Sequence, residues 1–252
     1  MRPPFGSIGQ SFIELQEVDS TNNYATALLH EGMASHGTVV FAHRQTAGKG
    51  QRHKSWVTGS TGLNIALTAV VHPHGLAASQ MFLLSMASAI AVQQFYSVYA
   101  GGKTKVKWPN DLYWNDRKAA GILIENSLSG TTWKHAIVGI GVNINQQTFP
   151  GLETSAVSLA NITGEQYNVI SLAKDLCKKL DDIFRLLLEN PGEIVDVYQT
   201  LLYRRDEQVR LKLGSRQFEA TIRGVLPSGE LVAWHGVEEL FTVGAVEWLV
   251  AK

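Results

Sequence analysis

Apolar side chains recur at helical spacing in two neighbouring stretches of the chain. Between residues 171 and 190 they are Leu172, Leu176, Leu180, Ile183, Phe184 and Leu187. This spacing places them on one face of an amphipathic helix, which Pro191 is expected to stop. Residues 192–203 repeat the pattern, so a second amphipathic helix is expected there.

Short apolar runs bounded by polar or turn residues predict strands. In the first two thirds of the chain these runs cover residues 13–18, 38–43, 64–71, 105–108, 112–114, 120–125 and 135–143. Pro109 cannot continue a central strand, so the run at residues 105–108 ends there. A turn at residues 115–116 joins the runs at residues 112–114 and 120–125 as a hairpin. A helix between the first two strands is expected to begin at Ser20 or Thr21, either of which suits an N-cap, and to end near His30.

Five further strands are expected after Arg205, over residues 208–213, 218–226, 230–234, 239–242 and 245–250. Turns that contain glycine separate most of them, which is the pattern of a small β-barrel. At 252 residues the chain is long enough for one large domain and a small appended one. We therefore divide it into residues 1–205 and residues 206–252.

Residues 76–100 carry no charged side chain, which raises the alternative of a transmembrane helix. Seven polar residues interrupt the stretch: Ser79, Gln80, Ser85, Ser88, Gln93, Gln94 and Ser97. Placing that many polar groups in lipid is costly, so a buried helix is the better interpretation and no membrane contact is expected. Gly101 is expected to end this helix.

The single cysteine, Cys177, leaves no pair for an internal disulfide, and no spacing of cysteine and histidine resembles a zinc site. Cys177 falls within a helical pattern, so a buried thiol is expected rather than a nucleophile. The first seven residues lack the apolar core of a signal peptide, so a cytoplasmic location is expected.

The distribution of charge indicates a local anion site. Asp and Glu are absent from residues 32–110, and the cations within that span are Arg44, Lys49, Arg52, Lys54, Lys103, Lys105 and Lys107. Asp111 is the first carboxylate after it. Any single lysine is more often a solvated surface residue, but these cations would bind an anion if they converge. The formal net charge is zero, which argues against nucleic-acid binding by the whole surface.

Residues 45–56 are a loop in which Gly48 and Gly50 flank Lys49, and basic and amide side chains then lead to Trp56. Glycine permits the conformations that turn successive N–H groups toward a phosphate. The glycine spacing is not that of a Walker loop. Three interpretations stay open: a solvated flexible loop, which composition favours; a nucleic-acid contact; and a loop that closes over a nucleotide with Trp56 stacked on a base.

Gly139 and Gly141 lie inside an apolar strand and leave one of its faces open to a ligand or a crossing backbone. Asn143, at the end of this strand, is either a turn residue or a side chain that reads a base edge. Lys118 begins the second arm of the hairpin beside small residues at 119–121, which let a ligand approach the backbone closely.

Taken in order, these stretches resemble biotin–protein ligase. The matching motifs are serine-threonine-asparagine at residues 19–22, the glycine-rich adenylate loop at 45–56, the lysine-tryptophan-proline-asparagine-aspartate core at 107–113, the lysine-glycine strand at 117–123 and the last active-site strand at 139–143. The similarity covers nearly the whole chain. It implies an α+β fold with a mixed central sheet and packed helices, like a class II synthetase, plus a small C-terminal SH3-like β-barrel.

The resemblance implies a two-step reaction. The carboxylate of biotin attacks the α-phosphorus of Mg²⁺-ATP to give biotinyl-5′-AMP, and a lysine of a biotin carboxyl carrier protein domain, in acetyl-CoA carboxylase or a related carboxylase, then takes the biotinyl group. Lys118, Asp111 and Lys49 are the implied catalytic residues, and Lys118 contacts the carboxylate and then the α-phosphate. Asp111 orients Lys118, binds Mg²⁺ through water, or accepts a proton. Mg²⁺ is otherwise held through ATP.

The other implied site residues form two sets. Those that bind biotin are Ser20, Thr21, Asn22, Gln45, Lys49, Gly50, Gln51 and Lys118. Those that bind the nucleotide are Lys49, Arg52, Trp56, Lys107, Asn110 and Asn143, with Trp56 over the adenine. Closing the loop at residues 45–56 would protect the mixed anhydride from water.

The chain departs from the family pattern at Lys49 and Gln51, where arginine is common, and at His53, where glycine is frequent. Lysine keeps the charge but loses the bidentate fork, so weaker retention of the intermediate is expected. No helix-turn-helix precedes the catalytic motifs, so no nucleic-acid partner is expected. The alternatives are a lipoate or octanoate transferase of the same fold and a non-catalytic nucleotide- or nucleic-acid-binding module. Monomer and homodimer both stay open.

Overall fold

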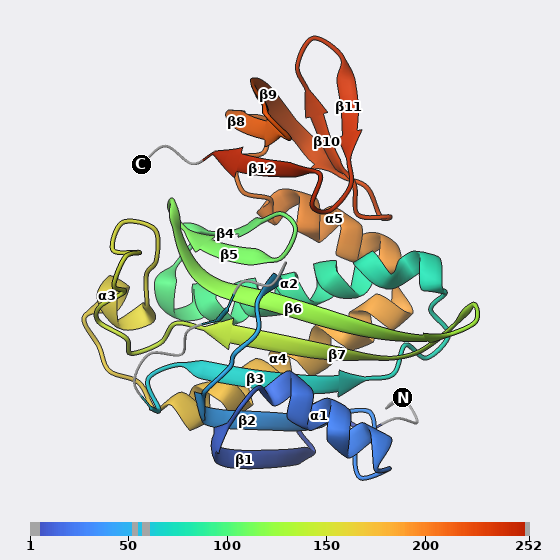
Figure 1. The fold of residues 1–252 in the computed structure, drawn as a ribbon, viewed down its shortest axis with the longest axis vertical. Coiled ribbons are helices and arrows are strands. Elements are labelled where there is room, and N and C mark those ends of the chain that lie inside the picture. The colour runs from blue at the N-terminus through green and yellow to red at the C-terminus, as the bar shows by residue number, and fades with distance from the viewer. Residues whose placement is uncertain (1–5, 52–54, 57–60, 250–252) are drawn as a thin grey trace.

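Seven strands form the larger of two sheets in the structure, a computed structural model that describes residues 6–51, 55–56 and 61–249. The strands are β1 (Ser11–Val18), β2 (Thr38–Gln45), β3 (Ile65–Val71), β4 (Thr104–Lys107), β5 (Asp111–Trp114), β6 (Arg117–Ser129) and β7 (Thr132–Val142). Their order across the sheet is β1-β2-β3-β7-β6-β5-β4 (Figure 1). The β1–β2 pair is parallel and the other neighbouring pairs are antiparallel, which confirms the expected mixed sheet.

Helices cover both faces of this sheet. On one face lie α2 (Met81–Ala100), which follows the short 3₁₀ helix η2 (Ala78–Gln80), and α4 (Val169–Glu189), with α5 (Pro191–Leu201) packed against both. The helix α1 (Thr21–His30) lies on the other face, and a short helix, α3 (Leu159–Thr163), follows the end of β7 (Figure 1). The amphipathic helices expected near residues 20–30, 171–190 and 192–203 are therefore confirmed.

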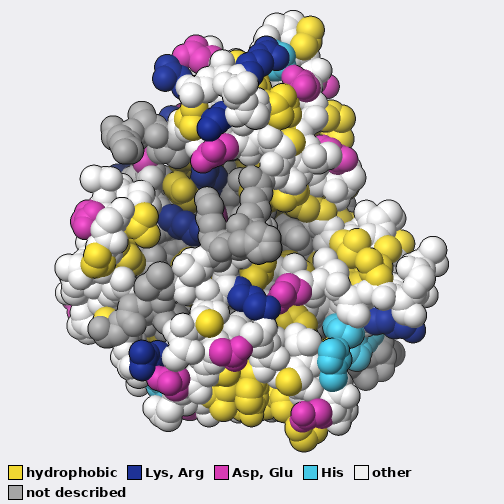
Figure 2. Space-filling model, viewed as in Figure 1, with side chains coloured by type: hydrophobic (Ala, Val, Ile, Leu, Met, Phe, Trp, Pro, Cys, Tyr) yellow, Lys and Arg dark blue, Asp and Glu magenta, His cyan; other side chains and the backbone are white. Residues whose placement is uncertain are grey.

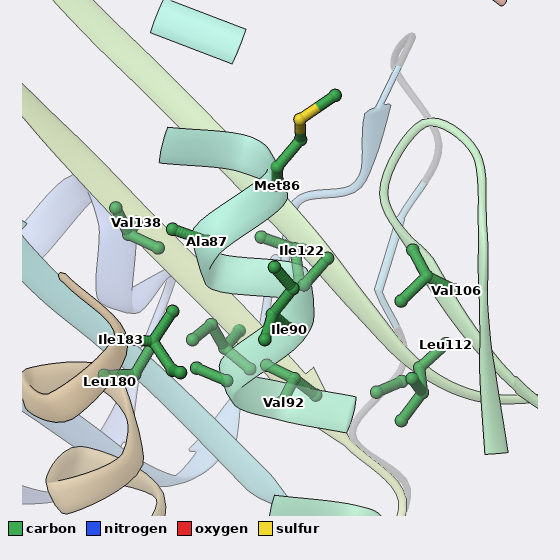
Figure 3. Packing of buried hydrophobic residues seen from close by; sticks show 14 of the residues in the cluster. Met86, Ala87, Ile90, Val92, Val106, Leu112, Ile122, Val138, Leu180 and Ile183 are labelled. Carbon is green, nitrogen blue, oxygen red and sulfur yellow. The ribbon is translucent and has the colours of Figure 1, made fainter. Parts of the chain in front are cut away.

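The main hydrophobic core fills the space between the sheet and α2 and α4. Ala87 and Ile90 of α2 lie close to Val138 and Ile122 of the sheet and to Ile183 of α4 (Figure 3). A smaller cluster joins α1 to the opposite face of the sheet, and its buried members are Ala25, Leu28, Val40, Val70 and Ile137. Burial of apolar surface on both faces is the main force that holds the layers together.

The uncharged stretch is a buried helix, as expected. Within the part of the chain that the structure describes, one helical segment, Ala78–Ala100, is long enough and apolar enough to cross a membrane. However, 67% of its 18-residue apolar stretch is buried inside the protein. The interrupting residue Gln93 is used in the core, because its Nε2 donates to the carbonyl oxygen of Thr104 at 3.1 Å. Gly101 ends the helix with φ of 73°, a conformation that favours glycine.

Two helix ends differ in detail from expectation. Ser20 is the N-cap of α1, but its side chain makes no capping hydrogen bond within the described residues. The backbone N–H of Thr21 donates instead to Gln45 Oε1 at 2.8 Å. Pro191 follows α4 and also begins α5, where its missing N–H is not needed. The start of α1 is thus held by a tertiary contact rather than by a local cap.

The C-terminal region forms a second, antiparallel sheet. Its strands are β8 (Gln208–Leu213), β9 (Arg216–Val225), β10 (Leu231–Trp234), β11 (Glu238–Phe241) and β12 (Val246–Leu249), in the order β11-β10-β9-β8-β12. Each lies within two residues of its expected bounds, and Val250 falls outside the described residues. The sheet fits the implied SH3-like barrel, whereas the domain boundary at residue 205 stays a prediction.

Candidate active site

A row of directly paired residues crosses the large sheet from its β4 edge. Lys107 of β4 pairs with Asp111 of β5. Asp111 in turn pairs with Gly121 of β6, which pairs with Gly141 of β7. Side chains of directly paired residues project from the same face of an antiparallel sheet. A cation, a carboxylate and two glycines therefore lie side by side, on the face that also carries α1, because Ile137 beneath α1 has the same parity along β7 as Gly141.

The glycines of this face leave room for side chains from other parts of the chain. A Cβ added at Gly141 would lie 2.2 Å from Cε2 of Trp56, and one at Gly121 would lie 3.1 Å from the same indole. A Cβ added at Gly139 would lie 2.2 Å from Oδ1 of Asn22. The open face expected on the strand of Gly139 and Gly141 is therefore present on β7. It receives two side chains rather than a crossing backbone.

Gly121, Gly139 and Gly141 together form a glycine floor, and a cavity lies over it. Its lining residues are Ser20, Thr21, Asn22, Gln45, Lys49, Gly50, Gln51, Trp56, Asn110, Asp111, Lys118, Gly121, Ile122, Leu123, Gly139, Ile140 and Gly141. The structure thus brings together all the residues that the motifs assign to biotin, which lie far apart in the sequence. The free volume is about 50 Å³, whereas small-molecule sites usually measure a few hundred Å³. The indole of Trp56 lies directly over Gly141 and beside Gly121.

Lys118 and Asp111 form an ion pair at one end of the cavity. Nζ of Lys118 lies 2.6 Å from Oδ1 of Asp111, and the two side chains are 34% and 21% exposed. The backbone of Lys118 is held as well, because its N–H donates to the carbonyl oxygen of Ser155 at 2.8 Å. The ammonium also lies 5.7 Å from the ring centre of Trp56. A half-buried cation with a fixed carboxylate beside it can stabilise anionic groups of a ligand.

At the other end of the cavity, hydrogen bonds link neutral side chains to one another and to the carboxylate of Glu125. Gln45 Oε1 accepts from the backbone N–H of Thr21 at 2.8 Å and lies 3.1 Å from its hydroxyl oxygen. The hydroxyl of Thr68 lies 2.7 Å from both Thr21 Oγ1 and Asn22 Oδ1. Asn22 Nδ2 donates to Glu125 Oε2 at 2.7 Å.

The motifs did not identify Thr68 or Glu125. The only signal in the sequence was a single hydroxyl residue inside the apolar run Ile65–Val71 and a carboxylate at the end of the predicted strand 120–125. Glu125 also reaches the glycine-rich loop, because its Oε1 lies 3.5 Å from Nζ of Lys49. Both side chains of that pair are more than 40% exposed, so the ion pair itself adds little stability.

Of the cations in the acid-free span that the structure describes, Lys49 is the one that lines the cavity. Lys103 lies 6.0 Å over the ring of Trp114, and Lys105 donates to the carbonyl oxygen of Thr200 at 3.1 Å, so both are turned toward other parts of the surface. Residues 52–54, which include the predicted nucleotide contact Arg52 and the departure His53, lie outside the described residues. On the face drawn in Figure 2, basic and acidic side chains lie interspersed rather than in one patch of a single sign.

Of three predicted nucleotide contacts, Asn110 lines the cavity, whereas Lys107 and Asn143 do not. Asn110 lines the cavity, and its Nδ2 donates to the carbonyl oxygen of Ile122 at 2.6 Å. Lys107 does not line it, and its ammonium lies 5.0 Å from the ring centre of Tyr113. Asn143 is buried just after the end of β7, and its Nδ2 donates to the backbone carbonyl oxygens of Lys118 and Val157. Its side-chain NH₂ group therefore has a structural role. Their contact with a nucleotide stays a prediction.

No metal centre is formed by the protein alone in the described part of the chain, where no group of three or more His, Cys, Asp or Glu side chains could hold an ion. Among the described residues that line the cavity, Asp111 is the one with a carboxylate, and one oxygen ligand suits Mg²⁺ carried by a nucleotide. Cys177 is a free buried thiol, as expected, and burial raises its pKa to about 12. It is therefore not a nucleophile at neutral pH.

Comparison with known proteins places these motifs in one family. Residues 14–143 match the biotin/lipoate A/B protein ligase family. The chain is 35% identical over 162 residues to the bifunctional ligase/repressor BirA of Bacillus spizizenii, covering 63% of this chain and 49% of that protein, so it spans about half the length of that relative. It is 31% identical over 227 residues to the biotin–[acetyl-CoA-carboxylase] ligase of Paracoccus denitrificans, covering 86% and 92% of the two chains. The fold matches the biotin protein ligase from Aquifex aeolicus in complex with biotin and ATP, with a TM-score of 0.80, 24% identity and coverage of 96% and 100%.

Proposed function

The chain belongs to the biotin/lipoate A/B protein ligase family, and on that premise we propose that it is an ATP-dependent, AMP-forming biotin–protein ligase. Its acceptor is a lysine of a biotin carboxyl carrier protein domain in acetyl-CoA carboxylase or a related carboxylase. The name of the Paracoccus relative supports this activity, and the Aquifex complex supports biotin and ATP as the two ligands. The observation that carries the proposal is a single cavity with neutral hydrogen-bonding groups at one end and Lys118 paired with Asp111 at the other.

The neutral end suits the ureido head of biotin. Ser20, Thr21, Asn22 and Gln45 present hydroxyl and amide groups there, and a ureido group both donates and accepts hydrogen bonds. The valerate tail then runs along the glycine floor, so that its carboxylate faces Lys118. Lys49, Gly50 and Gln51 lie against the carboxylate and the phosphate that joins it.

In the first step a carboxylate oxygen of biotin bonds to the α-phosphorus of ATP, and the bond from this phosphorus to the oxygen of the β-phosphate breaks. Pyrophosphate leaves with both electrons of that bond. Negative charges meet in this step, so the main contribution of Lys118 is electrostatic stabilisation and alignment. Its ion pair with Asp111 at 2.6 Å supports the orienting role for that carboxylate.

Mg²⁺ is expected to enter with the nucleotide. When bound to the phosphate oxygens, it neutralises part of the charge that the carboxylate must approach. The protein side of this contact would be Asp111, directly or through water, since Mg²⁺ prefers oxygen ligands and keeps several waters. Lys107, the next residue in the same row, is proposed to face the phosphates from the edge of the sheet.

Trp56 is proposed to leave the glycine floor when ligands bind. Its indole lies where a ligand would lie over Gly141, and the free volume of about 50 Å³ is too small for biotin and a nucleotide together. Turned away from Gly141, the same indole would cover the adenine. In that position it would also keep water from the mixed anhydride.

In the second step the amine of the carrier lysine attacks the carbonyl carbon of biotinyl-5′-AMP. An amide bond forms, the bond between that carbon and the phosphate oxygen breaks, and AMP leaves. The amine loses one proton as the amide forms. Asp111 is the carboxylate nearest to Lys118 in the cavity and the proposed acceptor if a protein group takes that proton.

Calorimetric titration of the purified protein with biotin and with lipoate tests the proposal, followed by mass spectrometry of the bound species after Mg²⁺-ATP is added. We expect selective binding of biotin and a bound mass equal to biotinyl-5′-AMP. Preference for lipoate would assign the chain to the lipoate branch of the family. Binding of neither ligand would contradict the proposal and return attention to the basic loop as a nucleic-acid contact, whose affinity would fall steeply with salt.

A further inference from the structure

One side-chain amide of α1 lies across three adjacent strands and is held by the outer two. Oδ1 of Asn22 accepts a hydrogen bond from the hydroxyl of Thr68 on β3 at 2.7 Å. Its Nδ2 donates to Oε2 of Glu125 on β6, also at 2.7 Å. Between them runs β7, where Gly139 has no Cβ to obstruct the amide. Asn22 therefore lies flat on the sheet, with a different strand at each end of its amide.

The two contacts determine which end of the amide faces which strand. A carboxylate only accepts hydrogen bonds, so Glu125 selects the NH₂ end of Asn22. The carbonyl end then faces the hydroxyl of Thr68, which donates to it. Reversing the amide would place its oxygen against the carboxylate, which is a repulsive contact. Glu125 and Thr68 together therefore hold one orientation.

Thr68 extends this arrangement to the next residue of the helix. Its hydroxyl is fully buried and lies 2.7 Å from Oγ1 of Thr21. Because the one hydroxyl proton of Thr68 goes to Asn22, the hydroxyl of Thr21 donates to Thr68, and Gln45 accepts from the backbone N–H of Thr21. The side chain of Ser20, at the N-cap, makes no capping hydrogen bond within the described residues. The first turn of α1 is thus anchored by the sheet, in a buried setting where a lost hydrogen bond is costly.

We infer that Thr68 and Glu125 are positioning residues that clamp the Asn22 amide and thereby place the first turn of α1 for recognition of the ureido head of biotin. Neither residue has to touch the substrate for this role. The inference rests on the proposed function for its substrate, whereas the clamp itself is a property of the protein without ligand.

Substitution at Thr68 separates the hydroxyl from the shape of the side chain. Thr68→Val keeps the shape and removes the hydroxyl, and Thr68→Ser keeps the hydroxyl. In calorimetry we expect Thr68→Val to raise the Kd for biotin about tenfold, while the KM for ATP in pyrophosphate exchange changes less than about twofold. Thr68→Ser should stay within about threefold of the unaltered protein. An equal rise in the Kd for biotin and in the KM for ATP would contradict a role confined to α1.

The side-chain amide of Asn22 reports on the clamp without any ligand. Its ¹⁵N-detected NH₂ resonances, assigned by their loss in Asn22→Ser, should shift in Thr68→Val and in Glu125→Ala but not in Glu165→Ala, a control at an exposed glutamate. Unmoved resonances in the first two variants would overturn the inference. Failure of the unaltered protein to bind biotin would instead overturn the proposed function, because the resonance test does not depend on biotin.

Discussion

The side chain of Lys118 crosses the place of Gly121 to reach Asp111. A Cβ added at Gly121 would lie 3.3 Å from Cε of Lys118, and Nζ of that lysine ends 2.6 Å from Asp111 Oδ1. In the register of the β5–β6 hairpin, Asp111 pairs with Gly121, while Lys118 pairs with Tyr113 beyond a shift in register. The ion pair therefore depends on a diagonal path over a residue that has no side chain.

Replacement of Lys118 by alanine should abolish most adenylate formation. Loss of a charge contact in the transition state costs on the order of several kcal/mol, so we expect a fall of more than about 100-fold in biotin-dependent ATP–pyrophosphate exchange. Lys178→Ala is the matched control, because Lys178 is 76% exposed and its ion pair is with a helical neighbour, Asp175. A decrease of a few-fold in Lys118→Ala would remove Lys118 from its assigned role.

Replacement of Trp56 by alanine should weaken the nucleotide site. Stacking of an aromatic ring on a base contributes about 1–3 kcal/mol, so the KM for ATP should rise about tenfold or more. Binding of biotin alone should not weaken, since Trp56 has to leave the floor for biotin to enter and the variant has no indole to displace. Trp234→Ala, at a partly exposed indole of the second sheet, serves as the control in the same kinetic assay. An unchanged dependence on ATP would exclude Trp56 from the adenine site.

Replacement of Gly141 by alanine should displace the indole of Trp56 and narrow the floor. The added Cβ would lie 2.2 Å from the ring, a distance that non-bonded atoms do not reach, so the ring has to move. We expect a change in tryptophan fluorescence and a fall of about tenfold in adenylate formation. Gly102→Ala is the control, because its added Cβ has nothing within 4 Å. Normal fluorescence and activity in Gly141→Ala would show that the floor is not used.

Stability should fall between pH 6.5 and pH 4 because of His36. Burial, followed by the nearby imidazoles of His74 and His72, lowers its pKa to about 4, against the opposite effect of Asp181. In this range the unfolded state binds more protons than the folded state, so the free energy of unfolding decreases as pH falls. His36 is only partly buried, so solvent screening limits the loss to about 1 kcal/mol.

Thermal unfolding of the protein and of His36→Asn from pH 7 to pH 4.5 measures this effect. The variant removes the titrating group while keeping an acceptor for the backbone N–H of His72, which donates to His36 Nδ1 at 3.1 Å. We expect a flatter dependence of Tm on pH in the variant. Parallel curves for the two proteins would contradict the assignment to His36.

Local patterns in the sequence were sufficient for the elements and for much of the site. The spacing of apolar residues determined the helix at Val169–Glu189, and turn residues placed the hairpin that carries Asp111 and Lys118, because both signals act over a few residues. The same is true of the short strands after Arg205. Motifs added the remaining cavity residues, since each motif is contiguous in the chain.

Long-range pairing was not visible in the sequence. The acid-free span suggested that its cations converge, but Lys103 and Lys105 turn away because their neighbours are Trp114 and the end of α5. Thr68 and Glu125 carried no motif, yet they hold Asn22 from two strands that β7 separates.

The sequence by itself thus determined which residues form helices, strands and glycine-rich turns, because backbone preference and hydrophobic periodicity are local properties. The tertiary structure alone decided which of these residues meet. Only the order β3-β7-β6-β5-β4 aligns Lys107, Asp111, Gly121 and Gly141 in one row. Only packing over the sheet brings Trp56 onto that row and Asn22 onto Gly139. Contacts between residues tens of positions apart depend on strand register and burial, which no short window of sequence contains.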